Sequence, residues 1–254
     1  MKDFTLQIFE QLCKEFLNRG YTFITFSEYC LNDRPPKFVI MRHDVDKTPE
    51  NALKIAYHEA NLKIKASFYL RVVRGSCDES LCRKISAMGH EIGYHYEDFV
   101  RAHADFEKAI ASFETNLNTL RRVYPVKTIC MHGSPLSKWD NRLLWQKYNY
   151  RDFGIVGEPY CDIDFNEVLY LTDTGRRWDA ADANIRDKVK SHYHYNIKST
   201  SGIIASLRNN ALPAKTMVTI HPHRWNDDFL PWLQEMIWQN TKNVAKHILV
   251  RMRR

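Results

Sequence analysis

The stretch KFVIMRHDVD, residues 37–46, begins as an apolar segment and ends in two aspartates. Its first six residues form the short apolar run that is typical of a buried strand. Thr48 and Pro49 follow closely, and a capping residue followed by proline indicates the start of a helix. The stretch therefore predicts a strand whose carboxyl end carries Asp44 and Asp46 and lies just before a helix.

The same alternation of short apolar runs and helical patterns continues along the chain. Between Phe106 and Leu120, apolar residues recur at intervals of three and four, which predicts a long helix. Further strands are predicted at residues 66–70, 91–95, 128–131, 153–156, 168–172 and 217–221. Strands that alternate with helices indicate an α/β fold with a parallel sheet.

Ionisable residues lie at the ends of most predicted strands. They are Asp44 and Asp46 after the first, His95 at the end of the third, His132 after the fourth, Glu158 after the fifth, Asp173 after the sixth and His221 at the end of the seventh. A barrel gathers such groups at the carboxyl ends of successive strands, whereas an open doubly wound sheet concentrates them at one switch point. The distribution favours a barrel with its active site at that end.

Asp44 and Asp46 are spaced two residues apart, so their carboxylates can point to the same side of an extended chain. One can bind a metal ion while the other accepts a proton from water that the metal activates. The alternative is that they only cap the helix at Thr48. Capping requires one side-chain oxygen, whereas this segment also carries Arg42 and His43, so we favour a metal site.

The segment GHEIGYH, residues 89–95, predicts a second part of that site. Gly89 and Gly93 bracket a short strand and allow close approach of the backbone. His95 lies at the strand end, and neutral imidazole is a common ligand of zinc and similar ions. A histidine by itself would fit a core or surface position equally well. Together with the two aspartates, His95 is predicted to be a metal ligand.

HDVD, followed about fifty residues later by GHEIGYH, resembles the first two motifs of the polysaccharide deacetylases, the NodB-homology or carbohydrate esterase 4 group. The resemblance spans roughly residues 38–225 and implies an irregular (β/α)7 barrel. It implies that Asp44 is the catalytic base and that Asp46 and His95 bind the metal. The implied cofactor is a divalent ion, with zinc as the first candidate.

The chain departs from the family's second motif at Phe99, where a further ligand histidine is usual. The third ligand is therefore open. Its candidates are Glu97, Asp98, His132 and one of His221 and His223, of which we expect His132 first. The final motif of the family resembles TIHPH, residues 219–223, and implies that His221 is the general acid.

Other family motifs are matched more loosely. MHGSP, residues 131–135, stands where the family has an arginine–proline motif, and because the arginine is absent, Arg42 or Arg176 would orient the base. The run RRWD, residues 176–179, weakly resembles the family's tryptophan–aspartate groove motif. We therefore expect Arg42, Arg176, Trp178 and Asp179 to contact substrate, with ordinary core packing as the alternative for Trp178.

The 254 residues suit a single domain with three parts: a helical lead-in at 1–36, a deacetylase-like barrel at 37–225, and a helix with a basic tail at 226–254. The net charge of +7 could attract nucleic acid. No recognition motif and no aromatic–basic stripe accompany it, so we expect no nucleic-acid partner. No run of about 18 apolar residues occurs, so we expect no membrane partner.

The six cysteines include no C-x-x-C pair, and the N-terminal segment shows no signal-peptide pattern. We therefore expect reduced thiols and a cytoplasmic location. Without a secretion signal, a cell-wall polymer is a poor candidate for the substrate. An intracellular sugar conjugate or another small amide fits better.

These features predict a metal-dependent hydrolase of a non-peptide C–N bond. The first expectation is removal of an acetyl group from an N-acetylated sugar or a related small conjugate. Two alternatives remain: hydrolysis of a cyclic amide or ureide on the same barrel, and a carbohydrate-binding relative that has lost catalysis. Comparing acetate release with ammonia release distinguishes deacetylation from hydrolysis of a cyclic amide or ureide. Measuring bound metal tests whether the protein is a relative that has lost catalysis.

Overall fold

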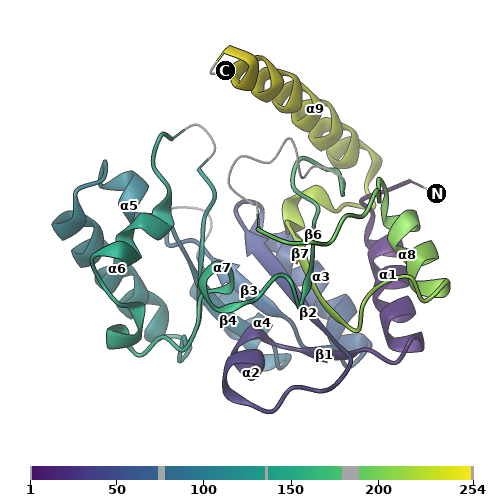
Figure 1. The fold of residues 1–254 in the computed structure, drawn as a ribbon, viewed down its shortest axis with the longest axis horizontal. Coiled ribbons are helices and arrows are strands. Elements are labelled where there is room, and N and C mark those ends of the chain that lie inside the picture. Colours follow the sequence, from purple (N-terminus) through teal and green to yellow (C-terminus); the bar gives the residue numbers. More distant parts are fainter. Residues whose placement is uncertain (1, 74–77, 135–136, 179–188, 253–254) are drawn as a thin grey trace.

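Seven parallel strands form one sheet in the computed structural model, which describes residues 2–73, 78–134, 137–178 and 189–252 (Figure 1). They are β1 (Thr22–Ile24), β2 (Phe38–Val45), β3 (Ser67–Leu70), β4 (Glu91–Tyr96), β5 (Ile129–Met131), β6 (Leu169–Thr172) and β7 (Lys215–Ile220). Their order is β5-β4-β3-β2-β7-β6, and β1 pairs with the first half of β2. All pairs are parallel, so the predicted α/β class is confirmed.

The sheet is curled into an incomplete barrel. Neighbouring strands lie about 4.8 Å apart, so in a flat sheet β5 would stand about 14 Å from β2. Yet His132 Nδ1, directly after β5, lies 3.0 Å from Asp46 Oδ1, directly after β2. The curl therefore brings the carboxyl ends of strands that are not neighbours to one place, as the predicted irregular barrel requires.

Helices connect successive strands, because a parallel pair needs a crossover between its members. They are α1 (Leu6–Asn18), α2 (Phe26–Leu31), α3 (Pro49–Asn61), α4 (Glu79–Ala87), α5 (Asp98–Arg101), α6 (Phe106–Arg121), α7 (Pro159–Asp162), α8 (Thr200–Arg208) and α9 (Phe229–Met252). Short 3-10 helices are η1 (Asn141–Gln146), η2 (Tyr150–Phe153) and η4 (Pro222–Arg224). Side-chain caps define the first residues of several of these helices. For example, Thr25 and Glu28 form a reciprocal capping box at α2.

Strand β2 is buried at every position and separates two parts of the core. Phe38 and Ile40 pack into the barrel interior with Tyr69 and Cys130. The alternate residues of the strand pack in the larger core under the helices. Since side chains alternate along a strand, Arg42 and Asp44 share the interior face, while His43 lies on the helix face.

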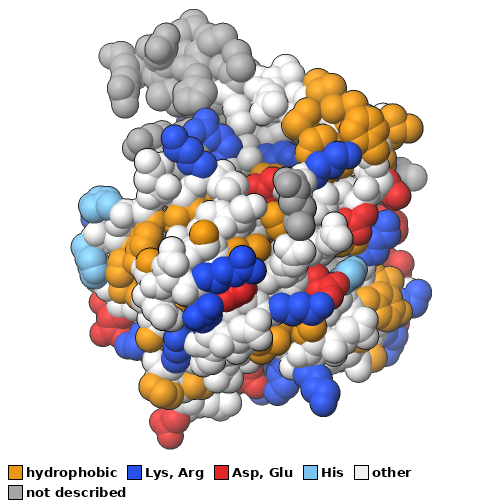
Figure 2. Space-filling model, turned by 90° about the vertical axis from the view of Figure 1, so that its right-hand side faces the viewer, with side chains coloured by type: hydrophobic (Ala, Val, Ile, Leu, Met, Phe, Trp, Pro, Cys, Tyr) orange, Lys and Arg blue, Asp and Glu red, His pale blue; other side chains and the backbone are white. Residues whose placement is uncertain are grey.

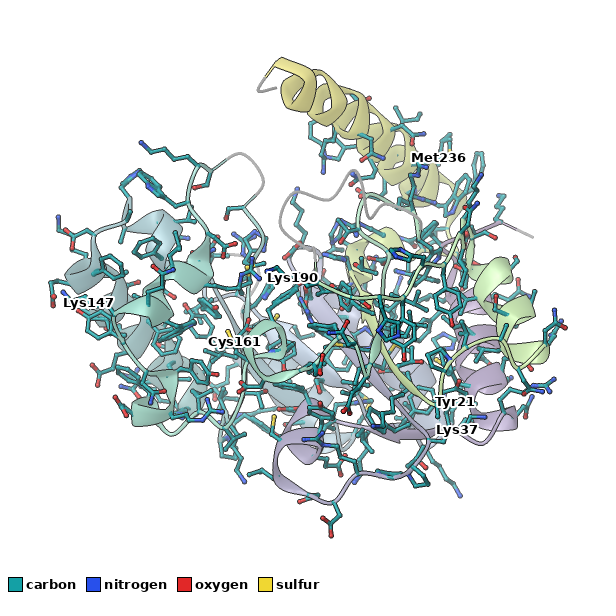
Figure 3. All side chains as sticks on the ribbon, viewed as in Figure 1. Tyr21, Lys37, Lys147, Cys161, Lys190 and Met236 are labelled. Atoms are coloured by element: carbon teal, nitrogen blue, oxygen red, sulfur yellow. The ribbon has the colours of Figure 1, made fainter. Side chains whose placement is uncertain are left out.

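Side chains fill the space between the sheet and its helices (Figure 3). At the start of β2, Lys37 lies beside Tyr21, with its Nζ 4.5 Å from the centre of the ring. The backbone of Thr22 donates to the carbonyl of Lys37 over 3.1 Å. These contacts fix β1 against the amino-terminal half of β2, which leaves the carboxyl ends of the strands free for chemistry.

Two segments differ from the sequence prediction. Residues 153–156 form no strand because Gly154 adopts a left-handed backbone (φ 69°) after η2, and only Gly157 pairs, through an isolated bridge to Thr128. Conversely, Thr22–Ile24, inside the predicted helical lead-in, forms β1. Three residues are too few to show an alternating pattern, and this strand exists only through its pairing with β2.

Charges of both signs are interspersed on the face that Figure 2 shows. Pairs such as Glu10–Lys14 and Glu15–Arg19 contribute to this mixing along α1. The positive net charge is therefore not gathered on this face. Among the described residues, no helix combines the length and the hydropathy that crossing a membrane requires.

Candidate metal centre

Three possible ligand atoms converge at the carboxyl ends of β2, β4 and β5. Asp46 Oδ1 lies 3.0 Å from His132 Nδ1 and 3.4 Å from His95 Nε2, and the two imidazole nitrogens are 3.3 Å apart. Ligand atoms that share one ion at 2.0–2.2 Å stand about 3–3.5 Å from one another. The spacing of Asp46, His95 and His132, which we call the ligand cluster, therefore fits a metal ion.

The environment of His95 suits a ligand. Its Nδ1 lies 2.9 Å from the carbonyl oxygen of Cys130, so this nitrogen carries the hydrogen and Nε2 turns its lone pair to the cluster. The side chain of His95 is 2% exposed, whereas those of Asp46 and His132 are 15% and 17% exposed. The cluster is thus rigid on one side and open to solvent on the other.

The charges of Asp46 and His132 stabilise each other. Burial would raise the pKa of Asp46, but the imidazole of His132 holds it well below its ordinary value. Burial would likewise lower the pKa of His132, and the carboxylate of Asp46 raises it instead. A divalent cation in the cluster would stabilise the Asp46 carboxylate in the same way.

Asp44 lies beside the ligand cluster and is held by Arg42. The guanidinium donates from Nε to Oδ1 over 2.8 Å and from Nη2 to Oδ2 over 2.5 Å, and both side chains are buried. Burial would raise the pKa of Asp44, but Arg42, together with His95 and His221, lowers it. Asp44 Oδ2 is 3.9 Å from His95 Nε2. Asp44 is therefore a carboxylate in contact range of any group bound at the cluster.

His221 faces the cluster from β7. Its Nε2 lies 4.0 Å from Asp46 Oδ2, and its Nδ1 lies 2.6 Å from Asp173 Oδ1. Asp173 is fully buried and also accepts from Arg224 Nη1 and Trp225 Nε1, each over 2.7 Å. Burial would raise the pKa of Asp173, but Arg224 and His221 lower it. The anionic Asp173 thus fixes the ring of His221 with Nε2 towards the cluster.

The other third-ligand candidates do not join the cluster. Glu97 accepts two bonds from Arg71, Asp98 accepts bonds from Tyr94, Ser112 and Asn116, and His223 lies 3.7 Å from Glu235. Phe99 is 2% exposed and packs on the ring of Phe106. A histidine at position 99 would therefore face the core, whereas His132, directly after β5, lies 3.0 Å from Asp46 Oδ1 and 3.3 Å from His95 Nε2.

Two residues expected in a substrate groove are packed elsewhere. Arg176 donates to the carbonyl of Trp232 over 3.0 Å, and its guanidinium lies 5.1 Å from the centre of the Phe4 ring. Trp178 is 6% exposed and donates to Thr200 Oγ1, as the core alternative for this residue requires. Arg42 is buried and holds Asp44 rather than facing solvent, and Asp179 lies outside the described residues.

Sequence reasoning missed several polar neighbours of the site. Arg71, directly after β3, donates to the backbone carbonyl of Asp46 over 3.3 Å, so it follows the strand-end rule that pointed to the other residues. Cys130 forms a second group with Asp44 and His95, whose ligand atoms lie within 4.8 Å of one another. No spacing in the sequence signalled Cys130, because it lies inside a short buried strand.

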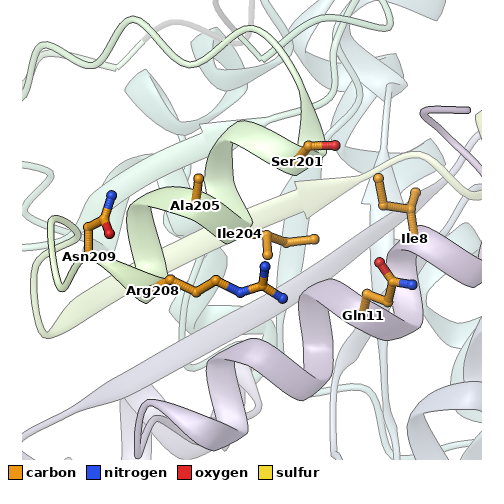
Figure 4. Close-up of a pocket in the computed structure, with 7 residues that line it drawn as sticks. All are labelled: Ile8, Gln11, Ser201, Ile204, Ala205, Arg208 and Asn209. Carbon is orange, nitrogen blue, oxygen red and sulfur yellow. The ribbon is translucent and has the colours of Figure 1, made fainter. Parts of the chain in front are cut away.

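A groove between α1 and α8 lies apart from the ligand cluster and differs from it in chemistry (Figure 4). Ile8, Gln11, Ile204 and Arg208 are among its lining residues. Arg208 is already paired with Glu15 across 3.0 Å. The groove therefore has no group of acids, bases or metal ligands among its lining residues. Among the described residues, the candidate ligand groups lie at the carboxyl ends of the strands.

Comparison with known proteins gives structural matches only. No protein-family model and no curated protein matches the chain. It is similar to a CE4 family pseudoenzyme from Bacillus anthracis, with 13% identity and a TM-score of 0.46. The match covers 83% of this chain and 61% of that chain. The chain thus spans about three fifths of that protein's length.

Two further solved structures belong to the same group. A Streptococcus mutans CE4 esterase is 14% identical over 92% of this chain and 90% of that chain, with a TM-score of 0.46. A family 4 acetyl xylan esterase from Clostridium thermocellum, in complex with a cobalt ion, is 17% identical over 80% of this chain and 83% of that chain, with a TM-score of 0.38. These proteins belong to the group that the HDVD and GHEIGYH segments resemble. At such TM-scores, the assignment of chemistry rests on the geometry described above.

Proposed function

We propose that the protein is a metal-dependent hydrolase of a non-peptide C–N bond. The main support for this proposal is the ligand cluster, in which a carboxylate oxygen and two imidazole nitrogens from separate strand ends lie 3.0–3.4 Å apart. Two further residues flank the cluster. Asp44 is a buried carboxylate held by Arg42, and His221 is a third histidine, bound to Asp173. This set supplies metal ligands, a base and an acid at one opening.

Asp46, His95 and His132 would hold a divalent ion. Two nitrogens and one carboxylate oxygen are a donor set that zinc and several other divalent ions accept. Three protein ligands leave a coordination position open, as catalytic sites require. When bound, such an ion supplies Lewis acidity that polarises a carbonyl oxygen and acidifies water.

Asp44 is the residue that would accept the proton of the attacking water. Arg42 keeps it ionised, since both guanidinium bonds are made to the charged form. The same bonds fix the direction of the carboxylate, and a fixed base loses less entropy in the reaction. Arg42 thereby fills the role of the arginine that the segment MHGSP lacks.

His221 is the residue that would give a proton to the leaving amine. Asp173 holds its Nδ1–H, so Nε2 is the nitrogen that exchanges protons with the substrate. The acid, directly after β7, and the base, near the end of β2, then both lie beside the ligand cluster, at 4.0 Å from Asp46 Oδ2 and 3.9 Å from His95 Nε2 respectively.

The substrate that we propose first is a small N-acetylated sugar or sugar conjugate. The segments resembling the deacetylase motifs supply the base and two ligands, Asp44, Asp46 and His95, and this supports acetyl transfer to water. A cyclic amide or ureide would use the same base, acid and ligands. The product distinguishes the two, because deacetylation releases acetate, whereas opening a ureide ring does not.

The experiment uses metal-stripped protein that is reloaded with Zn²⁺, Co²⁺ or Mn²⁺ and offered N-acetylglucosamine oligomers and allantoin. We expect metal-dependent acetate release in the wild type. Asp44→Asn should keep the metal and lose turnover, while Asp46→Ala should lose both. An Asp46→Ala protein that is fully loaded and active would refute the assignment. Metal binding without turnover of any amide would instead identify a non-catalytic relative.

A further inference from the structure

Strand β3 contributes no residue to the ligand cluster, although it lies between two strands that do. It pairs with β2 on one side and with β4 on the other (Figure 1). Asp46 follows β2 and His95 lies in β4, so these ligands come from strands that are not neighbours. Neighbouring strands lie about 4.8 Å apart, so β2 and β4 stand about twice that distance from each other. A side chain at the end of β3 is therefore well placed to hold both.

Arg71 is the residue that directly follows β3. Leu70, the last residue of the strand, pairs with Val45 of β2 and with Tyr94 of β4. Because the three strands are parallel, Arg71 lies level with the residue that follows each of these partners. Those two residues are the ligands named above. The register of the sheet thus places a long cationic side chain between them.

The guanidinium of Arg71 makes bonds in both directions. Nη1 donates to the backbone carbonyl of Asp46 over 3.3 Å. Nη2 donates to the two carboxylate oxygens of Glu97 over 2.8 Å and 2.9 Å. The side chains of Arg71 and Glu97 are 18% and 11% exposed, so this ion pair is largely withdrawn from solvent. Arg71 thereby links the segment after β2 to the segment after β4.

Asp46 lies just beyond the sheet, so the strand ladder does not hold it. Strand β2 ends at Val45, and the amide of Asp46 donates to the carbonyl of Asp44 over 3.1 Å. Thr48 then adopts a left-handed backbone (φ 48°) at the start of α3. Residues of a binding site need to be held within about 0.5 Å of their working positions by surrounding contacts. The bond from Arg71 to the carbonyl of Asp46 is such a contact.

Glu97 is a fixed point for this link. It follows β4 directly, two residues after His95, and its carbonyl accepts from the amide of Arg101 over 3.1 Å. Arg101 Nη1 also donates to Glu97 Oε1 over 3.3 Å, but its side chain is 60% exposed and comes from the same segment as Glu97. Of the two arginines bonded to Glu97, Arg71 is therefore the one that connects two strand ends.

We propose that Arg71 is a positioning residue that fixes Asp46 relative to His95 and thereby raises the affinity of the ligand cluster for a divalent ion. Its bond to Asp46 is made to the backbone and not to the ligand oxygen, so it acts through geometry. This role rests on the proposed function, since it requires the cluster to bind metal. Partners that orient the ligands of a metal typically contribute about 10- to 100-fold in affinity.

The test is the affinity of the full chain for Zn²⁺, measured by chelator competition. Arg71→Gln should weaken it by about 10- to 100-fold. Arg71→Lys should weaken it by about tenfold, because lysine keeps the charge but not the planar fork that bonds in two directions. The lysine variant decides the matter if the glutamine variant does not fold. Arg101→Gln is the matched control: it removes the other arginine on Glu97 and should stay within about twofold of the wild type.

Bound Co²⁺ provides a readout that a general loss of stability would not move. Its visible absorption depends on ligand geometry. At saturating Co²⁺, the spectrum should change in Arg71→Gln and match the wild type in Arg101→Gln. Glu97→Ala should weaken Zn²⁺ binding much as Arg71→Gln does, and the double variant should lose no more than either single variant, because the two side chains act as one unit.

Equal affinity for Zn²⁺ in the wild type and in both Arg71 variants would overturn the role of Arg71, and so would fully additive losses in the double variant. In either case the wild type still binds metal, so the proposed metal centre stands. A wild-type protein that binds neither Zn²⁺ nor Co²⁺ would instead refute the metal centre, and the role of Arg71 with it.

Discussion

Two clusters, each of one carboxylate and two histidines, lie on opposite faces of β2. The ligand cluster lies in the barrel interior. The other, which we call the sealed cluster, consists of Glu59, His43 and His90 under α3. His43 Nε2 lies 2.8 Å from Glu59 Oε1, and His90 Nδ1 lies 3.9 Å from Glu59 Oε2. The residue types match, yet their surroundings differ.

The difference lies in access and in bonding. All three side chains of the sealed cluster are 0% exposed, and His90 is further bonded to the carbonyl of Ala56 and the amide of Ala66. The ligand cluster keeps an exposed edge at Asp46 and His132. A metal site needs a path of entry, so composition alone does not mark one. His43, the first residue of HDVD, is a structural residue that lies between Arg42 and Asp44, two residues of the proposed site.

The largest expected effect is the loss of metal affinity in Asp46→Ala. Removing a direct ligand should weaken binding of added Zn²⁺ by at least about 100-fold, which is the upper range for outer-shell changes. Chelator competition measures the affinity, and the rise in melting temperature on adding Zn²⁺ should vanish. Retention of that rise would show that the metal binds elsewhere.

Glu59→Ala tests the sealed cluster. It should lower the free energy of unfolding by about 3 kcal/mol, because His43 and His90 lose a buried partner. Urea denaturation measures this change. Affinity for Zn²⁺ should stay within about twofold of the wild type, since the two clusters share no side chain. A loss of metal affinity in Glu59→Ala would mean that the two faces of β2 are coupled.

Asp173→Asn should lower the free energy of unfolding by about 2 kcal/mol near neutral pH, because Asp173 is a buried anion bonded to Arg224 and Trp225. The pKa of Asp173 is lowered in the folded protein from an ordinary value of 3.8. The wild-type advantage is therefore present above that value and is lost as the pH falls below it. Urea unfolding near pH 7 and near pH 3 checks this, and an advantage that grew in acid would contradict it.

Arg42→Lys should lower turnover by about tenfold while leaving bound metal unchanged, because lysine keeps the charge but not the two-point hold on Asp44. Steady-state kinetics and metal analysis provide the readouts. Arg142→Lys is the matched control, since Arg142 also lies near the Tyr160 ring (5.3 Å) but pairs with Asp140 instead. Equal losses in both variants would argue against a role for Arg42 in orienting the base.

Only a small effect on metal affinity is expected from Phe99→His, which introduces the histidine usual in the resembled family. The side chain at position 99 faces Phe106 in the core, so affinity for Zn²⁺ should stay within about twofold of the wild type. Stability should fall by about 2 kcal/mol through the loss of apolar burial. A clear gain in affinity would show that α5 can turn towards the ligand cluster.

The sequence was most informative where local pattern determines geometry. Asp44 and Asp46 share a side because strand residues alternate, and both were expected at the end of β2. His95 was expected at the end of a short strand bracketed by glycines, and in the structure Gly89 precedes β4 whereas Gly93 lies within it. The parallel α/β architecture followed from the alternation of apolar runs with helical periodicity. Each of these inferences needs information from only a few neighbouring residues.

The rest depends on the curl of the sheet and on tertiary packing. The sequence left several candidates for the third ligand, because only the curl brings His132 to Asp46 across β3 and β4. Arg176 and Trp178 were expected in a groove, but the chain after β6 turns under α9 and Phe4, which no local pattern indicates. Arg224 completes the surroundings of His221 only because η4 folds back over Asp173.

The pairing of β2 with β7 has a consequence for biosynthesis. One edge of this central strand, residues 38–43, bonds to residues 215–220, and the amides of Leu6 and Gln7 are capped by Asp227. In a nascent chain, this edge of β2 therefore has no partner until residues 215–220 have been made. Unpaired strand edges recruit other chains. We therefore expect the edge of β2 to be a site of misassociation during translation until β7 has formed.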